Sequence, residues 1–443
     1  MERLNAAGIY IDGGAASVKV DFGKVMERLR KVRAEISHND SAQRFTKLLG
    51  VDVFIGYGKF TGKRTIAVNG RTLTFKRAAV CTGGYPSLIP MPGVRELYDE
   101  ATNPYDTVVA RPAVMTNETI FNLTSLPQNM IVIGAGVVGL ELAQAMQRLG
   151  SSVTVLGRLG EILPKEDRDM AQLVKDQLNK DGVQFKLSVA KYQGIELTGN
   201  VLPNGLPEMK MTVMEEGNRV YTILLCDALL IAAGRRPNVS GIDLEKGGIE
   251  YDLEKGLKVN DKLQTTNPRV YGVGDVASDY KFTHAADFMA RIVIKNALFF
   301  GSEKVSDLLI PCATFTSPEI ASVGLYGSDL DKQGIKYRVI EKHFEDNDRS
   351  KTDDDTVGFV RFRVDANSDR ILGASIVGPD AGNMISEVTL AMQSDTGLGK
   401  LAAVIHPYPT TAEAIRQAGD VFNKTRLTNN VKQLLRGVIK LQR

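Results

Sequence analysis

Residues 22–50 show the first regular pattern in the chain, with apolar residues at three- and four-residue spacing among many charged ones. This spacing places the apolar side chains on one face, so it predicts an amphipathic helix, which Gly50 would end. Three stretches of alternating apolar and polar residues follow, VDVFIGYGKF, RTIAVNGRTLTF and RAAVCTGG, separated by glycine and Asn-Gly. Such alternation between turn residues predicts an antiparallel meander.

The middle of the chain changes to a strand–helix–strand order. A polar, proline-marked connector over residues 111–129 leads into an apolar strand at 130–133, a helix at 140–149 that Gly150 caps, and a second strand at 153–156. Further helix and strand follow as far as the segment IAAGRRPN. We expect an α/β fold in which a strand–helix–strand unit is inserted between segments of another domain.

The last third of the chain holds a Gly-Asp turn after VYGV and a long helix near residues 284–300. From about residue 311, the strands FVRFRVDA and RILGASIVG alternate with the helices MISEVTLAMQ and TTAEAIRQAG. The helix MISEVTLAMQ can cover one face of the resulting sheet, and an apolar surface on the other face would need a partner. We therefore expect a homodimer formed through this part of the chain.

The composition is that of a globular protein, with 43% hydrophobic and 24% charged residues among 443. Lys and Arg number 55 and Asp and Glu 52, and a net charge of only +3 gives no reason to expect nucleic acid or an acidic membrane surface as a partner. Cys81, Cys226 and Cys312 are too far apart in sequence for a disulfide framework or a zinc knuckle, so we expect no metal site. No apolar run approaches the roughly 18 residues that span a bilayer.

The strongest motif lies in the turn after the strand at 130–133. It reads Gly134-Ala135-Gly136-Val137-Val138-Gly139 and leads into Leu140. In such a G-x-G-x-x-G turn, the first glycine permits the tight turn, the second lets backbone approach a pyrophosphate, and the third lets the helix pack on the strand. The helix N-terminus then offers free N–H groups to the phosphates. We expect a dinucleotide site here, with a purely structural glycine turn as the alternative.

The tip of the second strand discriminates NAD from NADP, because an acid there binds the ribose 2′-hydroxyl and an arginine accommodates a 2′-phosphate. The sequence at this point is Leu156-Gly157-Arg158, and Glu161 lies three residues further out. We expect NADP(H), with Gly157 leaving room and Arg158 pairing with the extra phosphate. A solvated surface arginine is the alternative.

Several separated stretches resemble the pyridine nucleotide–disulfide oxidoreductases. They are RAAVCTGGYP at 77–86, AAGRRPN at 232–238, TTNPRVYGVGDV at 265–276, and the segment from FTSPE to VGL at 315–325. The resemblance covers essentially the whole chain, and it is closest to mercuric reductase and its dihydrolipoamide dehydrogenase-like relatives. It implies FAD/NAD(P)-binding Rossmann-type domains, the FAD domain being incomplete, and a C-terminal α+β dimerisation domain.

The resemblance also implies domain boundaries and cofactor positions. The implied domains are a partial FAD-binding domain at 1–125, an NADP-binding domain at 126–240, a return segment of the FAD domain at 241–310 and an interface domain at 311–443. The positions expected to bind FAD or NADPH, besides the glycine turn and Arg158, are Gly58, Thr82, Gly83, Gly84, Leu140, Glu141, Gly234, Asp275, Thr283 and His284. Asp275 would bind the flavin ribitol, and the helix that begins at Thr283 would face the isoalloxazine ring. Considered without the family, His284 is more often a capping or packing residue than a catalyst.

One departure from the family pattern concerns the start of the chain. The family begins with a G-x-G-x-x-G for FAD and a C-x-x-x-x-C redox pair followed by a lysine, and this chain has neither. We expect that about 80 to 90 N-terminal residues are missing from an incomplete gene model, an inference that also leaves organellar targeting open beside a cytoplasmic default. Glu141 then lacks its lysine partner. We expect the 443-residue chain to bind FAD weakly or not at all, and to reduce neither a disulfide nor mercuric ion with NADPH.

A second departure concerns the acid/base position near the C-terminus. The family's H-P-T-x-S-E appears here with Tyr408 in place of histidine and with Glu413 retained, while His406 falls two positions early. A phenol with a pKa near 10 cannot serve as a base at pH 7. Mercuric reductases also carry Tyr at this place, but their C-terminal cysteine pair is absent. The resemblance implies that Tyr408 and Glu413 reach the partner subunit's site.

Together these features predict an FAD- and NADPH-dependent oxidoreductase, mercuric reductase-like and homodimeric, that passes electrons to a disulfide, a small molecule or a metal ion. The competing hypothesis is a non-catalytic, NADPH-binding dimeric remnant without flavin or redox cysteines. Neither hypothesis includes a nucleic-acid or membrane partner.

Overall fold

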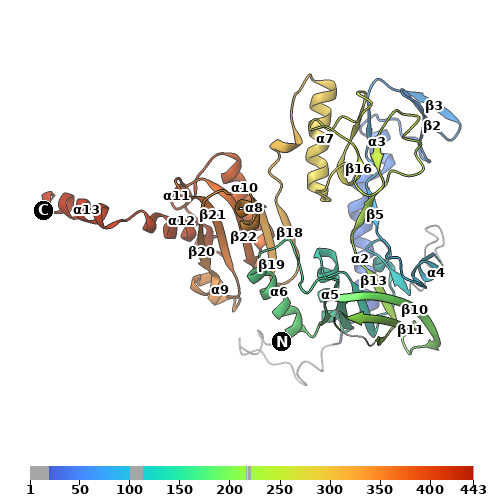
Figure 1. Ribbon diagram of the computed structural model, residues 1–443, viewed down its shortest axis with the longest axis horizontal. Helices are drawn as coiled ribbons and strands as arrows, with labels where there is room; N and C mark the ends of the chain where they lie inside the picture. The colour runs from blue at the N-terminus through green and yellow to red at the C-terminus, as the bar shows by residue number, and fades with distance from the viewer. Residues whose placement is uncertain (1–18, 100–112, 216, 218–220, 443) are drawn as a thin grey trace.

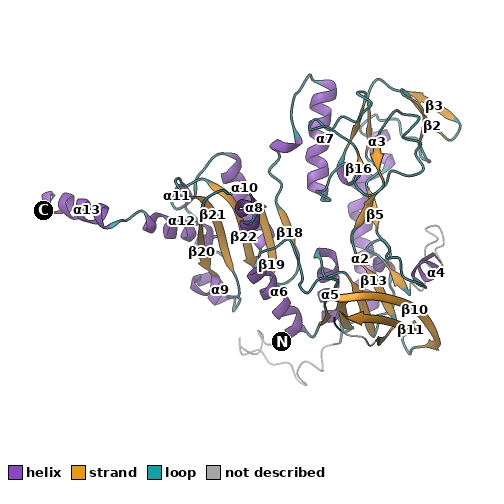
Figure 2. Ribbon diagram, in the orientation of Figure 1, coloured by secondary structure: helices purple, strands orange, loops and turns teal. Residues whose placement is uncertain are grey.

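The computed structural model describes residues 19–99, 113–215, 217 and 221–442, and the structural statements that follow concern these residues (Figure 1). The strands gather into a central group, a C-terminal group and a set of short strands on the side of the molecule away from the C-terminus (Figure 2). Helix α13 (Asn429–Leu441) extends from one end of the molecule, and α7 (Thr283–Leu298) stands at the top of the view. No helix in the described ranges combines the length and the hydropathy that a bilayer span requires.

A parallel sheet in the order β6-β13-β7-β8-β9 forms the central group. Its strands are β6 (Val114–Met115), β7 (Asn129–Ile133), β8 (Ser152–Leu156), β9 (Gln184–Lys186) and β13 (Ala228–Ile231). Its helices are α5 (Val137–Leu149) and α6 (Arg168–Asp181). The predicted strand–helix–strand unit is confirmed, and Gly150 ends α5 with a left-handed φ of 114°. Helix α5 begins before the predicted residue 140, because Gly136 already serves as its N-cap.

The prediction of a polar connector over residues 111–129 is wrong in part. Residues 111 and 112 lie outside the described ranges, but Val114 and Met115 are fully buried and pair in parallel with β13. The connector therefore supplies the edge strand of the central sheet. Residues 120–122 then form a short 3-10 helix, whose Ile120 is buried in the main core cluster.

A second, antiparallel sheet packs on the central one. Its strands are β10 (Val189–Val201), β11 (Pro207–Glu215) and β12 (Thr222–Cys226). Met209, Met211 and Val213 of β11 are fully buried and share one core cluster with Ile131 and Leu229 of the central strands. Burial of each such side chain contributes roughly 1.5 to 3 kcal/mol, so this apolar layer fixes the sheet in place.

The N-terminal elements follow the predicted pattern with two corrections. The structure forms α2 (Phe22–Ser37), α3 (Ala42–Lys47), β1 (Lys59–Gly62), β2 (Thr65–Val68) and β3 (Arg71–Thr74). The meander β1-β2-β3 is confirmed, but the expected single helix over 22–50 breaks at Ser41, whose hydroxyl caps α3 by accepting the N–H of Arg44. The stretch RAAVCTGG does not extend the meander, because β4 (Ala78–Val80) pairs in parallel with β17 (Val270–Gly272).

Short pairings tie this region to the return segment after β13. β5 (Gly84–Pro86) pairs with β14 (Arg235–Pro237), and α4 (Val94–Asp99) stands beside β6. Within the return segment itself, β15 (Tyr251–Asp252) pairs with β16 (Gly256–Leu257). The predicted Gly-Asp turn becomes a 3-10 helix at Gly274–Val276, and the predicted long helix becomes α7. Segments far apart in sequence thus meet around the Gly-Asp turn.

The C-terminal group is an antiparallel sheet in the order β18-β19-β22-β21-β20. Its strands are β18 (Cys312–Thr314), β19 (Glu319–Gly324), β20 (Tyr337–His343), β21 (Phe359–Asp365) and β22 (Ile371–Gly378). Its helices are α8 (Gly327–Lys332), α9 (Asp348–Thr352), α10 (Ala381–Gln393), α11 (Leu398–Leu401) and α12 (Glu413–Thr425). Helices α10 and α12 cover one face, where Phe362, Ile376, Val388 and Ile415 are fully buried.

The other face of this sheet contradicts the argument that an apolar surface there needs a partner subunit. That face carries Arg361, Arg363 and Ser375, and it contacts the segment before α6 within the same chain. Asp167 accepts hydrogen bonds from both arginines. Ile320, Phe359 and Val377 of the same face are buried in the core cluster of the central group. Because residues of the same chain already cover this face, it provides no reason for dimerisation.

Candidate functional site

The three glycines of the turn between β7 and α5 differ in whether a side chain could be accommodated in their place. Gly134 has a φ of +119°, and a Cβ there would lie 2.3 Å from the carbonyl oxygen of Ala232. A Cβ on Gly139 would lie 2.0 Å from the carbonyl oxygen of Gly134. A Cβ on Gly136, by contrast, would meet no atom within 4 Å. The first and third glycines are therefore required by packing, whereas the second faces open space.

That open space lies at the N-terminus of α5. Gly136 is the N-cap, and no side chain caps the first turn, so its N–H groups lack a side-chain acceptor. Val138 in this turn is 41% exposed. A helix N-terminus with free N–H groups and a glycine that admits close approach suits a phosphate group. The structure thus brings together the predicted residues Gly134, Ala135, Gly136, Val137, Val138, Gly139 and Leu140.

Arg158 lies exposed at the tip of β8, beside this turn. Within the described ranges Arg158 forms no hydrogen bond or ion pair. Its charge does act on Tyr192, where it opposes the burial that raises the pKa of that phenol to about 12. Glu161, the nearest acid in the loop, is engaged with Arg168 at 2.9 Å. The expected room at Gly157 is wrong, because a Cβ there would lie 2.8 Å from Leu187 and 3.3 Å from Ala135. Gly157 lets β8 pass close to the glycine turn.

A second cluster forms where three separated segments meet. Thr82 donates its hydroxyl hydrogen to the carbonyl oxygen of Asn238 at 2.7 Å, and the Asn238 side chain donates to the carbonyl oxygen of Thr82 at 3.0 Å. Arg235 donates to Asp275 at 3.2 Å and also to the carbonyl oxygen of Gly84. A Cβ on Gly84 would lie 2.8 Å from the carbonyl oxygen of Arg236 and 3.4 Å from an Asp275 carboxylate oxygen, so the strands approach closely here.

The remaining predicted glycines differ in what they require. Gly83 and Gly234 have φ values of +67° and +114°, and a Cβ at either position would meet no atom within 4 Å, so the backbone conformation selects glycine there. Gly58 precedes β1, where a Cβ would make ordinary contact with Ile66 at 3.5 Å. The sequence prediction did not assign a role to Arg235, although it lies in the quoted AAGRRPN segment.

The N-terminus of α7 adjoins the second cluster. Its first residues are Thr283 and His284, and no side chain caps them. The His284 ring stacks on Phe282 at 5.2 Å and donates its Nε2 hydrogen to the carbonyl oxygen of Pro311 at 2.8 Å. His284 is exposed and contacts Phe282 and Pro311, and its predicted position beside the isoalloxazine ring stays a prediction.

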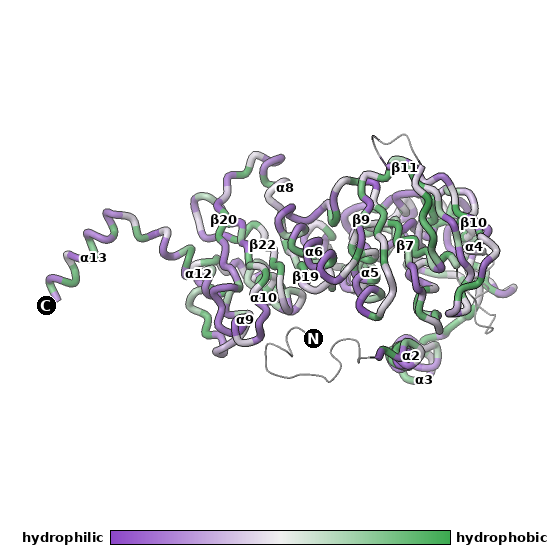
Figure 3. The backbone as a smooth tube through the Cα atoms, turned by 90° about the horizontal axis from the view of Figure 1, so that it is seen from below, coloured by the Kyte–Doolittle hydropathy of each residue, from purple (hydrophilic) through white to green (hydrophobic). Residues whose placement is uncertain are grey.

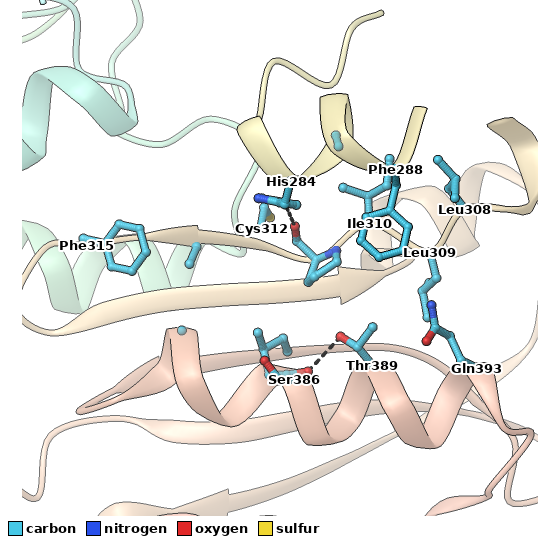
Figure 4. A pocket seen from close by; sticks show the side chains of 15 residues that line it. His284, Phe288, Leu308, Leu309, Ile310, Cys312, Phe315, Ser386, Thr389 and Gln393 are labelled. Atoms are coloured by element: carbon cyan, nitrogen blue, oxygen red, sulfur yellow. Dashed lines mark hydrogen bonds between the residues drawn. The ribbon is translucent and has the colours of Figure 1, made fainter. Parts of the chain in front are cut away.

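Beside His284 lies a largely apolar pocket of about 350 Å³ between α7, the segment before β18 and α10 (Figure 4). The side chains of Phe288, Phe315 and Ser386 line it, among others. Sequence reasoning missed this pocket, because its walls come from three elements that no local pattern connects.

Glu141, in the first half of α5, accepts the backbone N–H of Phe315 at 2.7 Å, and burial raises the pKa of its carboxyl. One turn further, Gln144 accepts the N–H of Ser317 and donates to the carbonyl oxygen of the same residue, both at 2.8 Å. Gln144 was not predicted as a functional residue. These side chains attach the nucleotide-binding helix to the loop between β18 and β19 of the C-terminal sheet.

Tyr408 and Glu413 lie on the far side of that sheet. Tyr408 is 71% exposed and donates its phenolic hydrogen to Asp348 at 3.0 Å, a hydrogen bond that raises the pKa of the phenol. Glu413 pairs with Arg416 at 2.6 Å. His406, which falls two positions early in sequence, points elsewhere and contacts Glu387 of α10 at 3.1 Å. The histidine therefore does not replace Tyr408 at this position.

The three cysteines are free thiols: Cys81 is exposed, Cys226 buried and Cys312 half-buried. Burial raises the pKa of all three thiols, to about 12 for Cys226. Among the described residues, no group of three or more His, Cys, Asp or Glu side chains is arranged to hold a metal ion.

Comparison with known proteins agrees with this geometry. The family model "Pyridine nucleotide-disulphide oxidoreductase" matches residues 13–290, and the model of the family's dimerisation domain matches residues 310–419. The dihydrolipoyl dehydrogenase of Thermus scotoductus is 33% identical over 377 residues, which are 84% of this chain and 76% of that protein. The mitochondrial dihydrolipoyl dehydrogenase of Sus scrofa is 33% identical over 416 residues, 91% of this chain and 75% of that protein.

Solved structures give the same result. The HOCl-induced flavoprotein disulfide reductase RclA from Escherichia coli superposes with a TM-score of 0.78 at 26% identity, covering 91% of this chain and 86% of that one. LpdA from Mycobacterium tuberculosis shares the fold with a TM-score of 0.78 at 24% identity, over 95% of this chain and 85% of that one. The chain therefore belongs to the pyridine nucleotide-disulphide oxidoreductases, a family of FAD-dependent enzymes that use NAD(P)H.

Proposed function

We propose that this chain is an oxidoreductase subunit that binds NADPH at the β7–α5 turn and, with FAD, passes electrons to a metal ion or another acceptor that needs no cysteine pair of the chain. The observation that carries the proposal is the open space at Gly136 in front of the uncapped α5. A nucleotide pyrophosphate can approach the backbone here, because Gly136 has no Cβ to occupy the open space.

The choice of NADPH over NADH rests on Arg158. It is a cation without an ion-pair partner in the described ranges, whereas Glu161 is engaged with Arg168. A 2′-phosphate at the tip of β8 would give Arg158 a charge-assisted contact that a 2′-hydroxyl cannot give.

The residues present fit one end of FAD. Asp275 offers a carboxylate to the ribitol hydroxyls, the backbone around Thr82 and Gly84 approaches it closely, and the uncapped first turn of α7 points N–H groups toward the ring end. FAD, when bound, supplies the ring that takes up hydride from NADPH. The chain holds a single G-x-G-x-x-G, already assigned to NADPH, so the pyrophosphate of FAD has no matching turn among its residues. We therefore propose weak FAD binding by these 443 residues.

Tyr408 would act as a hydrogen-bond donor. Its hydrogen bond to Asp348 raises the phenol pKa above the usual value of 10, so the group stays protonated at neutral pH. By donating this hydrogen to a bound acceptor in place of Asp348, it can orient that acceptor but cannot remove a proton from it. The match of residues 310–419 to the dimerisation domain supports a homodimer in which Tyr408 and Glu413 serve the partner subunit's site. The tyrosine is the feature that makes the site mercuric reductase-like.

The test is a titration of the 443-residue chain with NADPH, NADH and FAD, followed by NADPH oxidation at saturating FAD with ferricyanide as acceptor. We expect tight NADPH binding, weak FAD binding and measurable NADPH oxidation only when FAD is in excess. A disulfide substrate should remain unreduced, because no cysteine pair is present to receive electrons. NADPH binding without any FAD-dependent oxidation would instead establish the non-catalytic remnant.

A further inference from the structure

Helix α13 (Asn429–Leu441) has an apolar stripe that nothing in the described part of the chain buries. The stripe follows i, i+3, i+4, i+7 and i+8 spacing and consists of Val431, Leu434, Leu435, Val438 and Ile439. None of the residues of α13 is buried, and Leu434 and Ile439 are 68% and 53% exposed. This spacing places all five side chains on one side of the helix. Because helices of water-soluble folds normally pack such a face against a core, the stripe requires an explanation.

The position of α13 excludes a covering surface within the described part of the same chain. The helix leaves the C-terminal sheet after α12 and projects away from the other described elements in both views (Figure 1, Figure 3). It nevertheless has a defined start, because the Thr428 hydroxyl accepts the N–H of Val431. Thr428 is thus a helix N-cap for a segment without tertiary support.

The charges beside the stripe have one sign. Lys432, Arg436 and Lys440 follow i, i+4 and i+8 spacing, so they form a single row along one edge of the apolar face. Residues 421–443 contain six Lys or Arg and no Asp or Glu, although the whole chain has a net charge of only +3. The other 420 residues must therefore carry a net −3, and the cationic character is concentrated in the tail.

The dimensions of the helix restrict how it could meet a membrane. Its 13 residues correspond to about 20 Å, which is too short to cross a hydrocarbon core of about 30 Å. A short helix with apolar residues on one face and lysine and arginine on the other suits the plane of the interface instead. A second α13 would be a poor occupant of the stripe, because it would bring two cationic rows together without any acid to pair with them.

We propose that α13 binds the surface of an anionic lipid bilayer. Leu434 and Val438 would enter the boundary between headgroups and acyl chains, while Lys432, Arg436 and Lys440 extend their aliphatic stems along it and place their charges among the lipid phosphates. The proposal does not rest on the oxidoreductase function, since α13 is remote in sequence from both nucleotide clusters and requires neither cofactor.

The experiment is vesicle flotation of the full chain with phosphatidylcholine vesicles and with vesicles that also contain about 30% phosphatidylglycerol. We expect flotation with the anionic vesicles and little with the neutral ones. Each cation near an anionic surface contributes about a fivefold gain in partitioning, so the triple variant Lys432→Gln/Arg436→Gln/Lys440→Gln should bind about 100-fold more weakly. The variant Leu434→Ser/Val438→Ser should also lose binding, because it removes the inserted side chains.

The matched control is Arg28→Gln/Lys31→Gln/Lys47→Gln, which removes the same charge from exposed positions on α2 and α3 and should leave partitioning unchanged. NADPH affinity and the unfolding temperature should be unchanged in both tail variants, because α13 buries no residue. No flotation with anionic vesicles, equal flotation with neutral ones, or full binding by the triple variant would overturn the proposal. A sedimentation mass that falls in Leu434→Ser/Val438→Ser, without vesicle binding by the unmodified chain, would assign the stripe to a second copy instead.

Discussion

Asp167, which directly precedes α6, forms an ion pair with Arg363 of β21 across 196 residues of sequence. The Arg363 side chain is 2% exposed and also donates to the Ser375 hydroxyl at 3.1 Å, and burial lowers the pKa of the guanidinium. Arg361, two residues earlier, donates to Asp167 at 2.8 Å as well. A carboxylate of the nucleotide-binding unit thus compensates a buried charge of the C-terminal sheet.

Asp167→Ala should lower the free energy of unfolding by about 3 to 5 kcal/mol, because it leaves Arg363 buried without its counter-charge. Urea denaturation measures the change. Asp169→Ala is the matched control, since Asp169 contacts Arg361 but is 53% exposed, and it should cost no more than about 1 kcal/mol. The double variant Asp167→Ala/Arg363→Met should recover most of the loss. Equal effects of the two single variants would show that the buried pair is not special.

Glu166 should make stability depend on pH. Its carboxylate accepts hydrogen bonds from Tyr326 at 3.0 Å and Ser322 at 3.1 Å, yet burial raises its pKa above the ordinary 4.5. A raised folded-state pKa means that the contribution of Glu166 is complete below about pH 4.5 and is lost as the pH rises through the folded-state value.

Glu166→Gln carries no charge at any pH, so its unfolding temperature relative to the unmodified chain should rise between pH 4.5 and neutrality. Thermal unfolding at a series of pH values measures the difference. Glu208→Gln is the opposite case, because hydrogen bonds from Asn200 and Thr198 lower the pKa of that exposed carboxyl. A pH-independent difference for Glu166→Gln would contradict the prediction.

Arg158→Glu should reverse the nucleotide preference. A charge-assisted hydrogen bond contributes about 1.5 to 3 kcal/mol, so NADPH should bind roughly 10- to 150-fold more weakly while NADH changes little. Isothermal titration gives both dissociation constants, and Lys165→Glu repeats the charge change in the same loop as a control. Equal dissociation constants for NADPH and NADH in the unmodified chain would refute the assignment of Arg158.

Substitutions in the glycine turn should separate effects on NADPH binding from effects on the stability of the fold. Gly136 has φ −94° and ψ −174°, which any residue can adopt, and its Cβ position is open. Gly136→Ala should therefore leave the unfolding temperature unchanged and weaken NADPH at least about tenfold, by closing the approach to the phosphates. Gly139→Ala places a Cβ 2.0 Å from a backbone oxygen and should cost about 1 to 3 kcal/mol of stability. If both variants lose only stability, the turn is structural.

Local signals made the strand–helix–strand unit and the meander predictable. Glycine at the end of α5 and turn residues between β2 and β3 act within a few residues, so a sequence window contains them. The partner of β4 could not be predicted, because β17 lies about 190 residues further along the chain. Nor could a two-residue edge strand such as Val114–Met115 be distinguished from a loop, since its identity depends entirely on burial.

One error came from how the sequence was interpreted. In FVRFRVDA, period-two alternation already separates Phe362 on one face from Arg361 and Arg363 on the other, so a charged second face was available from the pattern. The net charge of +3, for its part, says nothing about how the charges are distributed along the chain. In the candidate site, the glycine turn could be predicted because its motif is local. The roles of Gln144 and Arg235 could not, because each side chain bonds to a residue more than 150 positions away in the sequence.

Gln144 binds both the N–H and the carbonyl group of Ser317, as a neighbouring β-strand would. The Gln144 side chain, on helix α5, thus makes with the loop residue Ser317 the pair of hydrogen bonds that two adjacent strands make with each other. Hydrogen exchange at the Ser317 amide should then report the opening of α5 and not the fraying of a connector. The nucleotide-binding unit and the C-terminal sheet would unfold in a single cooperative transition, and occupation of the glycine turn would slow proton exchange in the sheet that follows it.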